Sequence, residues 1–309
     1  MRFLKWQRSC RHKAAYRFDD PAANQLLLKA MRHPEWIKVP STGMHGTKKI
    51  LRNHGVSTVC EEARCPNQGR CFSNSTATFM ILGDRCTRNC SFCAVESSMP
   101  LPPDPGEPER VAEAAIELGL KFVVITSVTR DDLADGGAGQ FVSSIKALKS
   151  RNKSIKIEVL TPDFNGDYEA LRSVLDAYPD VFNHNVETVP RLYSTVRQKA
   201  DYTRSINVLT FAGDNYPRIK TKSGIMLGLG EKRTEVLDVM QDLRGAGCDF
   251  LTIGQYLRPR RTNIPVVEYI TPEVFTEYKS IGLEMGFEAV ASSPLTRSSM
   301  DADRMFEGS

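Results

Sequence analysis

The segments CEEARCPNQGRC (residues 60–71) and CTRNCSFC (residues 86–93) hold six of the eight cysteines of this chain of 309 residues. The first segment has the spacing C-x4-C-x5-C, and the second has C-x3-C-x2-C. A structural zinc site or a ferredoxin-type cluster takes four protein ligands, whereas each segment offers three cysteines. In a 4Fe–4S cluster held by three thiolates, one iron stays open to water, another side chain or a chelating small molecule. The second segment therefore has the ligand count of a cluster that touches its substrate or cofactor.

The second cysteine segment follows a short apolar run, TFMILG (residues 78–83), which is typical of a buried parallel strand. From there strand and helix patterns alternate. The expected strands are 78–83, 122–128, 155–160, 181–187, 222–227 and 249–254, and the expected helices are 108–119, 140–149, 168–178, 190–198, 206–212, 234–246 and 272–285. This alternation predicts a parallel sheet with right-handed crossovers. Cysteines stand where an open doubly wound sheet would have a Gly-rich phosphate loop, so we favour an α/β fold with a partial, TIM-like (β/α)6 barrel.

Polar residues gather at the expected C-terminal ends of the strands, where barrels carry their chemistry. They are Thr126, Ser127, Asn183, Asn185, Glu187, Lys222 and Ser223. We therefore expect the site at this end of the barrel.

Residues 1–58 show no strong period and are interrupted by proline and glycine, with short helices expected at 24–31 and 47–53. We expect three parts along the chain. An N-terminal extension (1–72) carries the first cysteine segment, the barrel spans 73–292, and a C-terminal tail covers 293–309.

The bulk composition excludes several classes of protein. The net charge of +4 is mild, which argues against nucleic acid as the main ligand, and no apolar run predicts a transmembrane helix. The tight cysteine spacing indicates metal in a reducing compartment rather than a disulfide scaffold. The N-terminus lacks the apolar region of a secretory signal, and its basic residues fit either a targeting remnant or a plain basic tail. We expect a cytoplasmic protein, or alternatively one of the mitochondrial or plastid matrix, in which Cys10 and Cys248 bind no metal.

CTRNCSFC, in the loop after the first strand, resembles the CxxxCxxC signature of radical S-adenosylmethionine (SAM) enzymes. Preceded by CEEARCPNQGRC, it resembles the lipoyl synthase family in particular. The matching segments also include ITSVTRDDLADGGAGQF, VFNHNVETVPRLY, KSGIMLGLGE, LTIGQYLRP and PLTRSSM. The resemblance thus covers most of the chain.

The resemblance implies that Cys86, Cys90 and Cys93 hold a 4Fe–4S cluster whose open iron binds SAM. One electron then cleaves SAM and yields a 5′-deoxyadenosyl radical, which can take hydrogen from an unactivated alkyl carbon. In this family the carbons are C6 and C8 of an octanoyl chain, amide-linked to a lysine of a carrier protein. One sulfur is inserted at each carbon, and two SAM molecules are consumed.

The resemblance also implies a second, auxiliary 4Fe–4S cluster, which supplies the sulfur. Its ligands would be Cys60, Cys65, Cys71 and, from the RSS motif near the C-terminus, Ser299. A hard serine oxygen on iron should be displaced easily, as suits a cluster that is dismantled when it donates sulfide. The family motif usually continues with tyrosine, but this chain has Met300.

Five further residues are expected to contact SAM. Asn185, Glu187 and Arg197 lie where radical SAM folds contact the ribose and carboxylate, and Thr126 and Ser127 lie where many members bind the amino group. For the first three the alternative is hydrogen bonding and charge pairing at the barrel rim. For Thr126 and Ser127 it is the capping of a strand end.

Other polar residues have open interpretations. Lys222 could be a SAM or substrate contact or a solvated charge, and the loop of Asp131, Asp132, Gly136 and Gly137 could be functional or simply shaped by local Asp hydrogen bonds. If the triplets bound zinc, His54 or His184 could complete a Cys3His site. Neither triplet resembles a zinc ribbon, and we expect His184 to be structural.

The resemblance implies several partners. The substrate is an octanoylated carrier, either the glycine cleavage H protein or an E2 domain of a 2-oxoacid dehydrogenase. Reduced ferredoxin or flavodoxin would donate electrons, and an iron–sulfur carrier would rebuild the auxiliary cluster. We expect no nucleic acid or membrane partner.

Two competing functions differ in what they require. A methylthiotransferase would need an additional N-terminal domain, for which this chain has no room. A non-catalytic zinc or iron–sulfur carrier would need the cysteines but not the series of strands and helices with polar ends.

Overall fold

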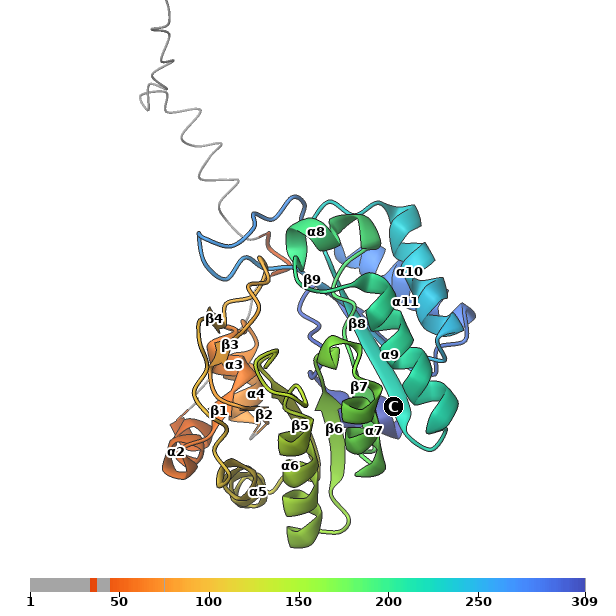
Figure 1. The fold of residues 1–309 in the computed structure, drawn as a ribbon. Helices are drawn as coiled ribbons and strands as arrows, with labels where there is room; N and C mark the ends of the chain where they lie inside the picture. Colours follow the sequence, from red (N-terminus) through yellow and green to blue (C-terminus); the bar gives the residue numbers. More distant parts are fainter. Residues whose placement is uncertain (1–33, 38–44, 75, 309) are drawn as a thin grey trace, which may run out of the picture. The chain divides into compact units, whose positions relative to one another are not determined.

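The computed structural model describes residues 34–37, 45–74 and 76–308, and the chain divides into two compact units, Met1–Lys38 and Val39–Ser309. Every element below belongs to the second unit (Figure 1). The strands are β1 (Ser57–Thr58), β2 (Thr78–Ile81), β3 (Arg85–Cys86), β4 (Glu96–Ser97), β5 (Phe122–Ser127), β6 (Lys156–Leu160), β7 (Val181–Asn183), β8 (Lys220–Leu227), β9 (Phe250–Gln255) and β10 (Ala289–Ser293). The α-helices are α2 (His45–His54), α3 (Val59–Glu62), α4 (Gln68–Ser73), α5 (Glu107–Glu117), α6 (Ala138–Arg151), α7 (Tyr168–Asp176), α8 (Tyr193–Val196), α9 (Tyr202–Asn215), α10 (Arg233–Gly245), α11 (Pro272–Glu284) and α12 (Ala302–Glu307), with 3-10 turns η1 (Phe164–Gly166) and η2 (Pro190–Leu192).

The main sheet has the order β1-β2-β5-β6-β7-β8-β9-β10. All neighbours from β2 onward are parallel, and only β1 runs antiparallel, against β2. Within the described residues β1 and β10 are not paired with each other, so the barrel is open. The α/β fold with a parallel, partial barrel is therefore confirmed, and its helices cover the outside of the sheet (Figure 1).

The helices begin where side chains satisfy the free N–H groups of the first turn. Asp167 accepts hydrogen bonds from the backbone of α7, and Asp201 accepts one from Arg204 N (2.7 Å) at the start of α9. Between sheet and helices lies an apolar core that includes Phe79, Ile125 and Phe182, each with no exposed surface. Burying such side chains supplies the main driving force for folding, roughly 1.5–3 kcal/mol each.

The structure differs from the expected barrel in its strand count. A seventh parallel strand, β10, follows the expected last helix. Its sequence, AVASS, lacks an apolar run, and only Val290 in it is buried, so the pattern of a buried strand is missing.

The expected strand 181–187 was too long, because β7 ends at Asn183. Backbone contacts to β8 continue, with His184 N bonding Lys222 O (3.0 Å) and Glu187 N bonding Gly224 O (2.9 Å). Three residues on one side thus span two on the other, which is the geometry of a β-bulge, and Glu187 takes a positive φ of 65°.

The expected N-terminal helix 47–53 is present as α2, whereas the expected helix 24–31 and Cys10 lie outside the described residues. The tail contains an unexpected helix, α12, whose Phe306 ring lies 5.7 Å from that of Phe122. The boundaries at residues 72 and 292 stay predictions. No helix in the described residues is both long and apolar enough to cross a membrane.

Candidate functional site

Cys86, Cys90 and Cys93 lie in the loop that follows β2, with Cys86 at the end of the short strand β3. The Cys86 sulfur accepts hydrogen bonds from two backbone N–H groups, those of Arg88 (3.4 Å) and Thr129 (3.3 Å). Burial raises the pKa of Cys90, and raises that of Cys93 to about 12. Sulfurs that are partly buried and face N–H donors fit metal-bound thiolates, because metal binding deprotonates the thiol outright.

Asn263, which the sequence did not single out, fastens this loop to the segment after β9. Its side-chain amide donates to Cys93 O (2.7 Å) and Ser91 O (3.1 Å), and Ile264 N donates to Ser91 O (3.0 Å). The Asn263 Oδ1 atom is buried without a hydrogen-bond partner. One asparagine in a polar loop gives no recognisable signal in the sequence.

The bulge after β7 brings Asn185, Glu187 and Arg197 together. Asn185 Nδ2 donates to Glu187 Oε1 (3.1 Å), and Arg197 Nη1 donates to Asn185 O (3.0 Å). Burial would lower the pKa of Arg197, but the neighbouring Tyr193, Glu187 and Cys90 outweigh it and raise the pKa. Arg197 and Glu187 both influence the pKa of Cys90, so these residues lie next to the second cysteine loop.

Several buried polar atoms around this loop have no hydrogen-bond partner in the described protein. They include Asn185 Oδ1, Arg197 Nε and Ser127 Oγ. Such atoms are rare in folded proteins and need an explanation. A ligand that carries both donors and acceptors, as SAM does with its amino, carboxylate and ribose groups, fits them.

Thr126 and Ser127 have different surroundings. The Thr126 hydroxyl donates to Leu160 O (3.0 Å). Thr126 therefore caps a strand end, which was the alternative to a contact with SAM. The buried Ser127 hydroxyl has no protein partner. Of the two, Ser127 is therefore the one free to meet a ligand.

Cys60, Cys65, Cys71 and Ser299 line one cavity, although the serine follows the cysteines by more than two hundred residues. Its other lining residues are Asn67, Thr76, Ala77, Thr78, Arg297 and Met300. Burial raises the pKa of Cys60 to about 12, against hydrogen bonds from Thr78, and that of Cys71 to about 11. Three soft thiolates beside one hard hydroxyl fit the ligand set that the sequence implied.

Gly254 and Asn67 hold the tail against this cavity. A Cβ atom on Gly254 would collide with the carbonyl oxygen of Thr296, so glycine allows the turn before Ser299 to approach the sheet. Asn67 Nδ2 donates to Leu295 O (2.6 Å) and to the Met300 sulfur (3.2 Å). Met300 thus lines the cavity with a defined contact in place of the usual tyrosine.

The histidines needed for a zinc site are occupied elsewhere. His184 Nδ1 lies 2.9 Å from Thr161 O and its Nε2 lies 3.1 Å from Ser205 Oγ, while His54 Nε2 lies 2.7 Å from Glu117. In the described part of the chain no three Cys, His, Asp or Glu side chains form a group that could hold a metal ion. Zinc needs its ligands to converge on one ion, whereas a 4Fe–4S cluster takes one thiolate per iron.

Lys222 and Ser223 do not lie at a strand end, contrary to expectation, because β8 begins at Lys220. Lys222 is also no solvated charge: its ammonium bonds both oxygens of Glu158 (2.9 and 3.0 Å), and 1% of each side chain is exposed. Asn183 Nδ2 adds a third bond to the carboxylate (2.8 Å). This is a buried ion pair inside the barrel.

The loop that contains Asp131 and Asp132 forms both local and distant hydrogen bonds. Asp132 does bond its neighbour Arg130, with two contacts of 2.8 Å. Asp131 instead bonds Arg88, within the second cysteine segment. No linear pattern pairs Asp131 with an arginine 43 residues earlier.

His184 should make stability depend on pH. Burial, followed by the charge of Arg197, lowers its pKa to about 4 from an ordinary 6.5. The unfolded chain therefore binds a proton between these values that the folded chain refuses, and stability falls as the pH falls. We expect a loss of about 2 kcal/mol in the free energy of unfolding between pH 7 and pH 5 from this group.

Urea unfolding of the wild type and of His184→Gln at both pH values measures this contribution. The variant should be less stable at pH 7 but should lose less stability on acidification. Equal losses in the two proteins would contradict a neutral, buried His184.

Comparisons with known proteins identify the family of this chain. Residues 80–243 match the family model described as the radical SAM superfamily. The chain is 57% identical to a lipoyl synthase of Caldanaerobacter subterraneus subsp. tengcongensis, over 88% of the chain and 96% of that protein. It is 52% identical to a lipoyl synthase of Methylococcus capsulatus (89% and 86% covered) and 51% identical to one of Haemophilus influenzae (92% and 90% covered).

Solved structures resemble the fold at low sequence identity. Streptococcus suis SuiB bound to S-adenosylmethionine matches with a TM-score of 0.54 at 12% identity, over 72% of this chain and 52% of SuiB. Methylornithine synthase (PylB) matches with a TM-score of 0.50 at 13% identity, over 84% of this chain and 85% of its own. At these identities the likeness shows the fold alone.

Proposed function

The chain belongs to the lipoyl synthase family within the radical SAM superfamily, and from that membership we propose which of its residues carry the reaction. The enzyme uses SAM and a 4Fe–4S cluster to insert sulfur at C6 and C8 of an octanoyl group on a lysine of a lipoyl carrier. The assignment of ligands and contacts rests on the two cysteine sites described above. The observation that carries it is the meeting of Ser299 with Cys60, Cys65 and Cys71 in one cavity.

Cys86, Cys90 and Cys93 hold the SAM-binding cluster in this proposal. Asn263 and the backbone N–H groups at Cys86 keep the loop in place around it. When bound, the cluster supplies the electron that cleaves SAM to the 5′-deoxyadenosyl radical. The protein's part is to hold the ligands and to leave the fourth iron without a side chain.

In this proposal SAM is bound by Asn185, Glu187, Arg197 and Ser127. The buried Asn263 Oδ1 belongs to the segment after β9, which bonds the second cysteine loop. The unpartnered Asn185 Oδ1, Arg197 Nε and Ser127 Oγ offer both donors and acceptors, and Arg197 and Glu187 lie close enough to Cys90 to influence its pKa. Arg197 also braces the bulge through Asn185 O, so it positions the site as well as facing it. We assign Thr126 to the strand end rather than to SAM, because its hydroxyl already donates to Leu160.

Cys60, Cys65, Cys71 and Ser299 hold an auxiliary cluster that supplies the sulfur. The three thiolates would hold their irons firmly, whereas the serine oxygen would be the weak member of the set. An auxiliary cluster in this cavity would therefore be held least firmly at Ser299. Asn67 and Gly254 hold the tail so that Ser299 stays at the cavity.

The partners follow from the same family membership. The substrate is a lipoyl carrier, for which we propose the glycine cleavage H protein or an E2 domain. We propose reduced ferredoxin or flavodoxin as electron donor and an iron–sulfur carrier for rebuilding the auxiliary cluster. Because the reported relatives are bacterial, we place the enzyme in the cytoplasm.

Metal analysis after anaerobic reconstitution tests the cluster assignment. We expect about eight irons and eight sulfides per chain and no zinc, as two 4Fe–4S clusters require. The reconstituted enzyme, given SAM, a reductant and an octanoylated carrier, should add two sulfurs to the carrier by mass spectrometry. Four irons would remove the auxiliary cluster from the proposal, and stoichiometric zinc without iron would overturn it entirely.

A further inference from the structure

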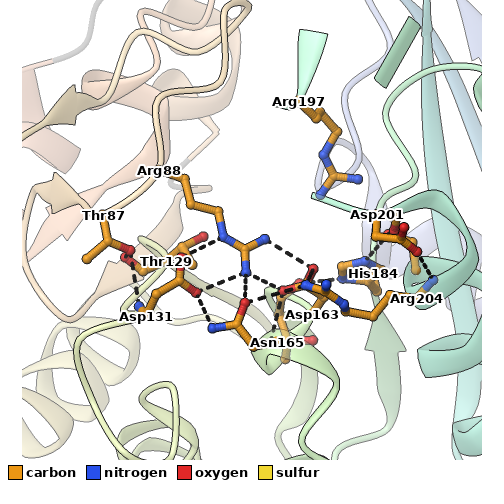
Figure 2. A network of polar contacts seen from close by, with 12 residues as sticks. Thr87, Arg88, Thr129, Asp131, Asp163, Asn165, His184, Arg197, Asp201 and Arg204 are labelled. Atoms are coloured by element: carbon orange, nitrogen blue, oxygen red, sulfur yellow. Dashed lines mark hydrogen bonds and ion pairs between the residues drawn. The ribbon is translucent and has the colours of Figure 1, made fainter. Parts of the chain in front are cut away.

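Arg88 lies between Cys86 and Cys90, and its side chain is fixed by residues of two other loops at once (Figure 2). The guanidinium bonds Asp131 after β5 through Nε (2.8 Å) and Nη2 (2.9 Å). It bonds Asp163 after β6 through Nη1 (3.1 Å) and Nη2 (2.6 Å), and Asn165 in η1 through Nη2 (2.8 Å). We call this set the Arg88 clamp.

The central pair of the clamp, Arg88 and Asp163, is buried and ionised. Of the Arg88 side chain 4% is exposed, and of the Asp163 side chain none. Burial alone would raise the pKa of Asp163, but the hydrogen bonds and charge of Arg88 outweigh it and hold that pKa at about 2. Arg204 of α9 adds a second cation, 3.2 Å from Asp163.

A buried ion pair contributes little net stability, because both charges lose their hydration. A role in stability alone therefore explains the clamp poorly. What it does provide is a fixed geometry, since a planar guanidinium that bonds two carboxylates cannot rotate without breaking several bonds.

The clamp is connected to the Cys86 sulfur through backbone N–H groups. Arg88 N is one of the two N–H groups that bond this sulfur, and Thr129 N is the other. Thr87 joins the same two segments, because its N–H bonds Thr129 O (3.1 Å) and its hydroxyl accepts from Asp131 N (3.1 Å). Movement of Arg88 would therefore move both donors relative to the sulfur.

We propose that Arg88 is a positioning residue that sets the reduction potential of the SAM-binding cluster by holding two backbone N–H groups on Cys86. The inference rests on the proposed function, in which Cys86 is a ligand of that cluster. Hydrogen bonds to cluster sulfurs stabilise the more negative, reduced state and so raise the potential. Loss of the clamp should therefore make the cluster harder to reduce.

The test uses a chain in which Cys60, Cys65 and Cys71 are alanine, so that only the SAM-binding cluster contributes iron and an EPR signal. In this background Arg88→Gln should lower the reduced fraction at a fixed potential about tenfold, which is 59 mV for one electron. Arg88→Lys keeps the positive charge but not the planar set of N–H donors. The reduction potential of its cluster should therefore lie between those of Arg88→Gln and the parent. In the full chain both variants should slow SAM cleavage.

Arg130→Gln is the matched control. Arg130 is equally buried, lies in the loop after β5 beside Asp131 and bonds Asp132 twice, but no hydrogen bond joins its side chain to residues 84–98 in the described structure. It should lower the melting temperature as Arg88→Gln does while leaving the potential unchanged. If Arg88→Gln does not fold, the potential of Arg88→Lys decides.

Two results overturn the proposal, and they differ. A parent cluster with normal iron content whose potential is the same in the Arg88 variants would show that the clamp is merely structural. A parent chain that binds no four-iron cluster through Cys86, Cys90 and Cys93 would overturn the proposed function and the clamp together.

Discussion

Replacement of Cys90 by alanine abolishes cleavage of SAM and all formation of lipoyl product; this is the largest effect we expect. A 4Fe–4S cluster with three thiolates has no spare ligand, and Cys90 is the cysteine beside Arg197 and Glu187. With only two thiolates, a second iron would lack its cysteine ligand, and the cluster would no longer be held with a single open iron. The chain should still fold, because the Cys90 sulfur lies at the surface of the core rather than within it.

Two measurements check this result. Release of 5′-deoxyadenosine should fall to background, and the iron content should fall from about eight to about four per chain, since the auxiliary site is intact. Cys248→Ala is the control, because Cys248 is fully buried and outside both triplets. It should cost about 1 kcal/mol of stability and keep both clusters and activity. SAM cleavage by the Cys90 variant would refute the ligand assignment.

Replacement of Cys65 or Ser299 by alanine should separate the two halves of the reaction. SAM cleavage should continue, because the second cysteine loop is unchanged, whereas sulfur insertion should stop. The Cys65 variant loses a firm ligand and should retain about four irons. The Ser299 variant loses only the weak ligand, and its auxiliary cluster should form but decay faster.

Ser299→Cys provides the informative contrast. A thiolate in the same place should hold the auxiliary cluster more firmly and slow the release of sulfide, so iron content should stay near eight while product falls. Carrier mass and 5′-deoxyadenosine, measured in the same reaction, distinguish these cases. Lipoyl product from the Cys65 variant would show that the sulfur has another source.

The local parts of the site could be predicted from the sequence. Cys86, Cys90 and Cys93 lie within eight residues, so their spacing alone indicated one cluster, and the alternation of strands and helices placed them at the barrel mouth. The meeting of Ser299 with the first triplet was implied only by resemblance. No periodic pattern joins residues more than two hundred positions apart.

Other features depend on three-dimensional geometry that a linear pattern does not contain. VFNHNVE alternates like a strand throughout, yet the bulge after Asn183 turns Asn185 and Glu187 towards the mouth. For Lys222 the sequence left open a ligand contact or a solvated charge, whereas in the structure it forms a buried ion pair with Glu158. The Arg88 clamp joins three loops, each of which looks like an ordinary polar turn on its own.

The auxiliary cavity has a consequence for how the protein matures. Its cysteines precede the first long parallel strand, but Arg297, Ser299 and Met300 follow the last one. During translation the cysteines leave the ribosome early, while the opposite wall is not yet synthesised. The second cysteine loop has all its cysteines by residue 93 and its clamp by residue 165. The cysteines of the second loop and its clamp are therefore synthesised before the last residue of the auxiliary site, and an auxiliary cluster can gain its serine ligand only after every strand of the barrel has been made.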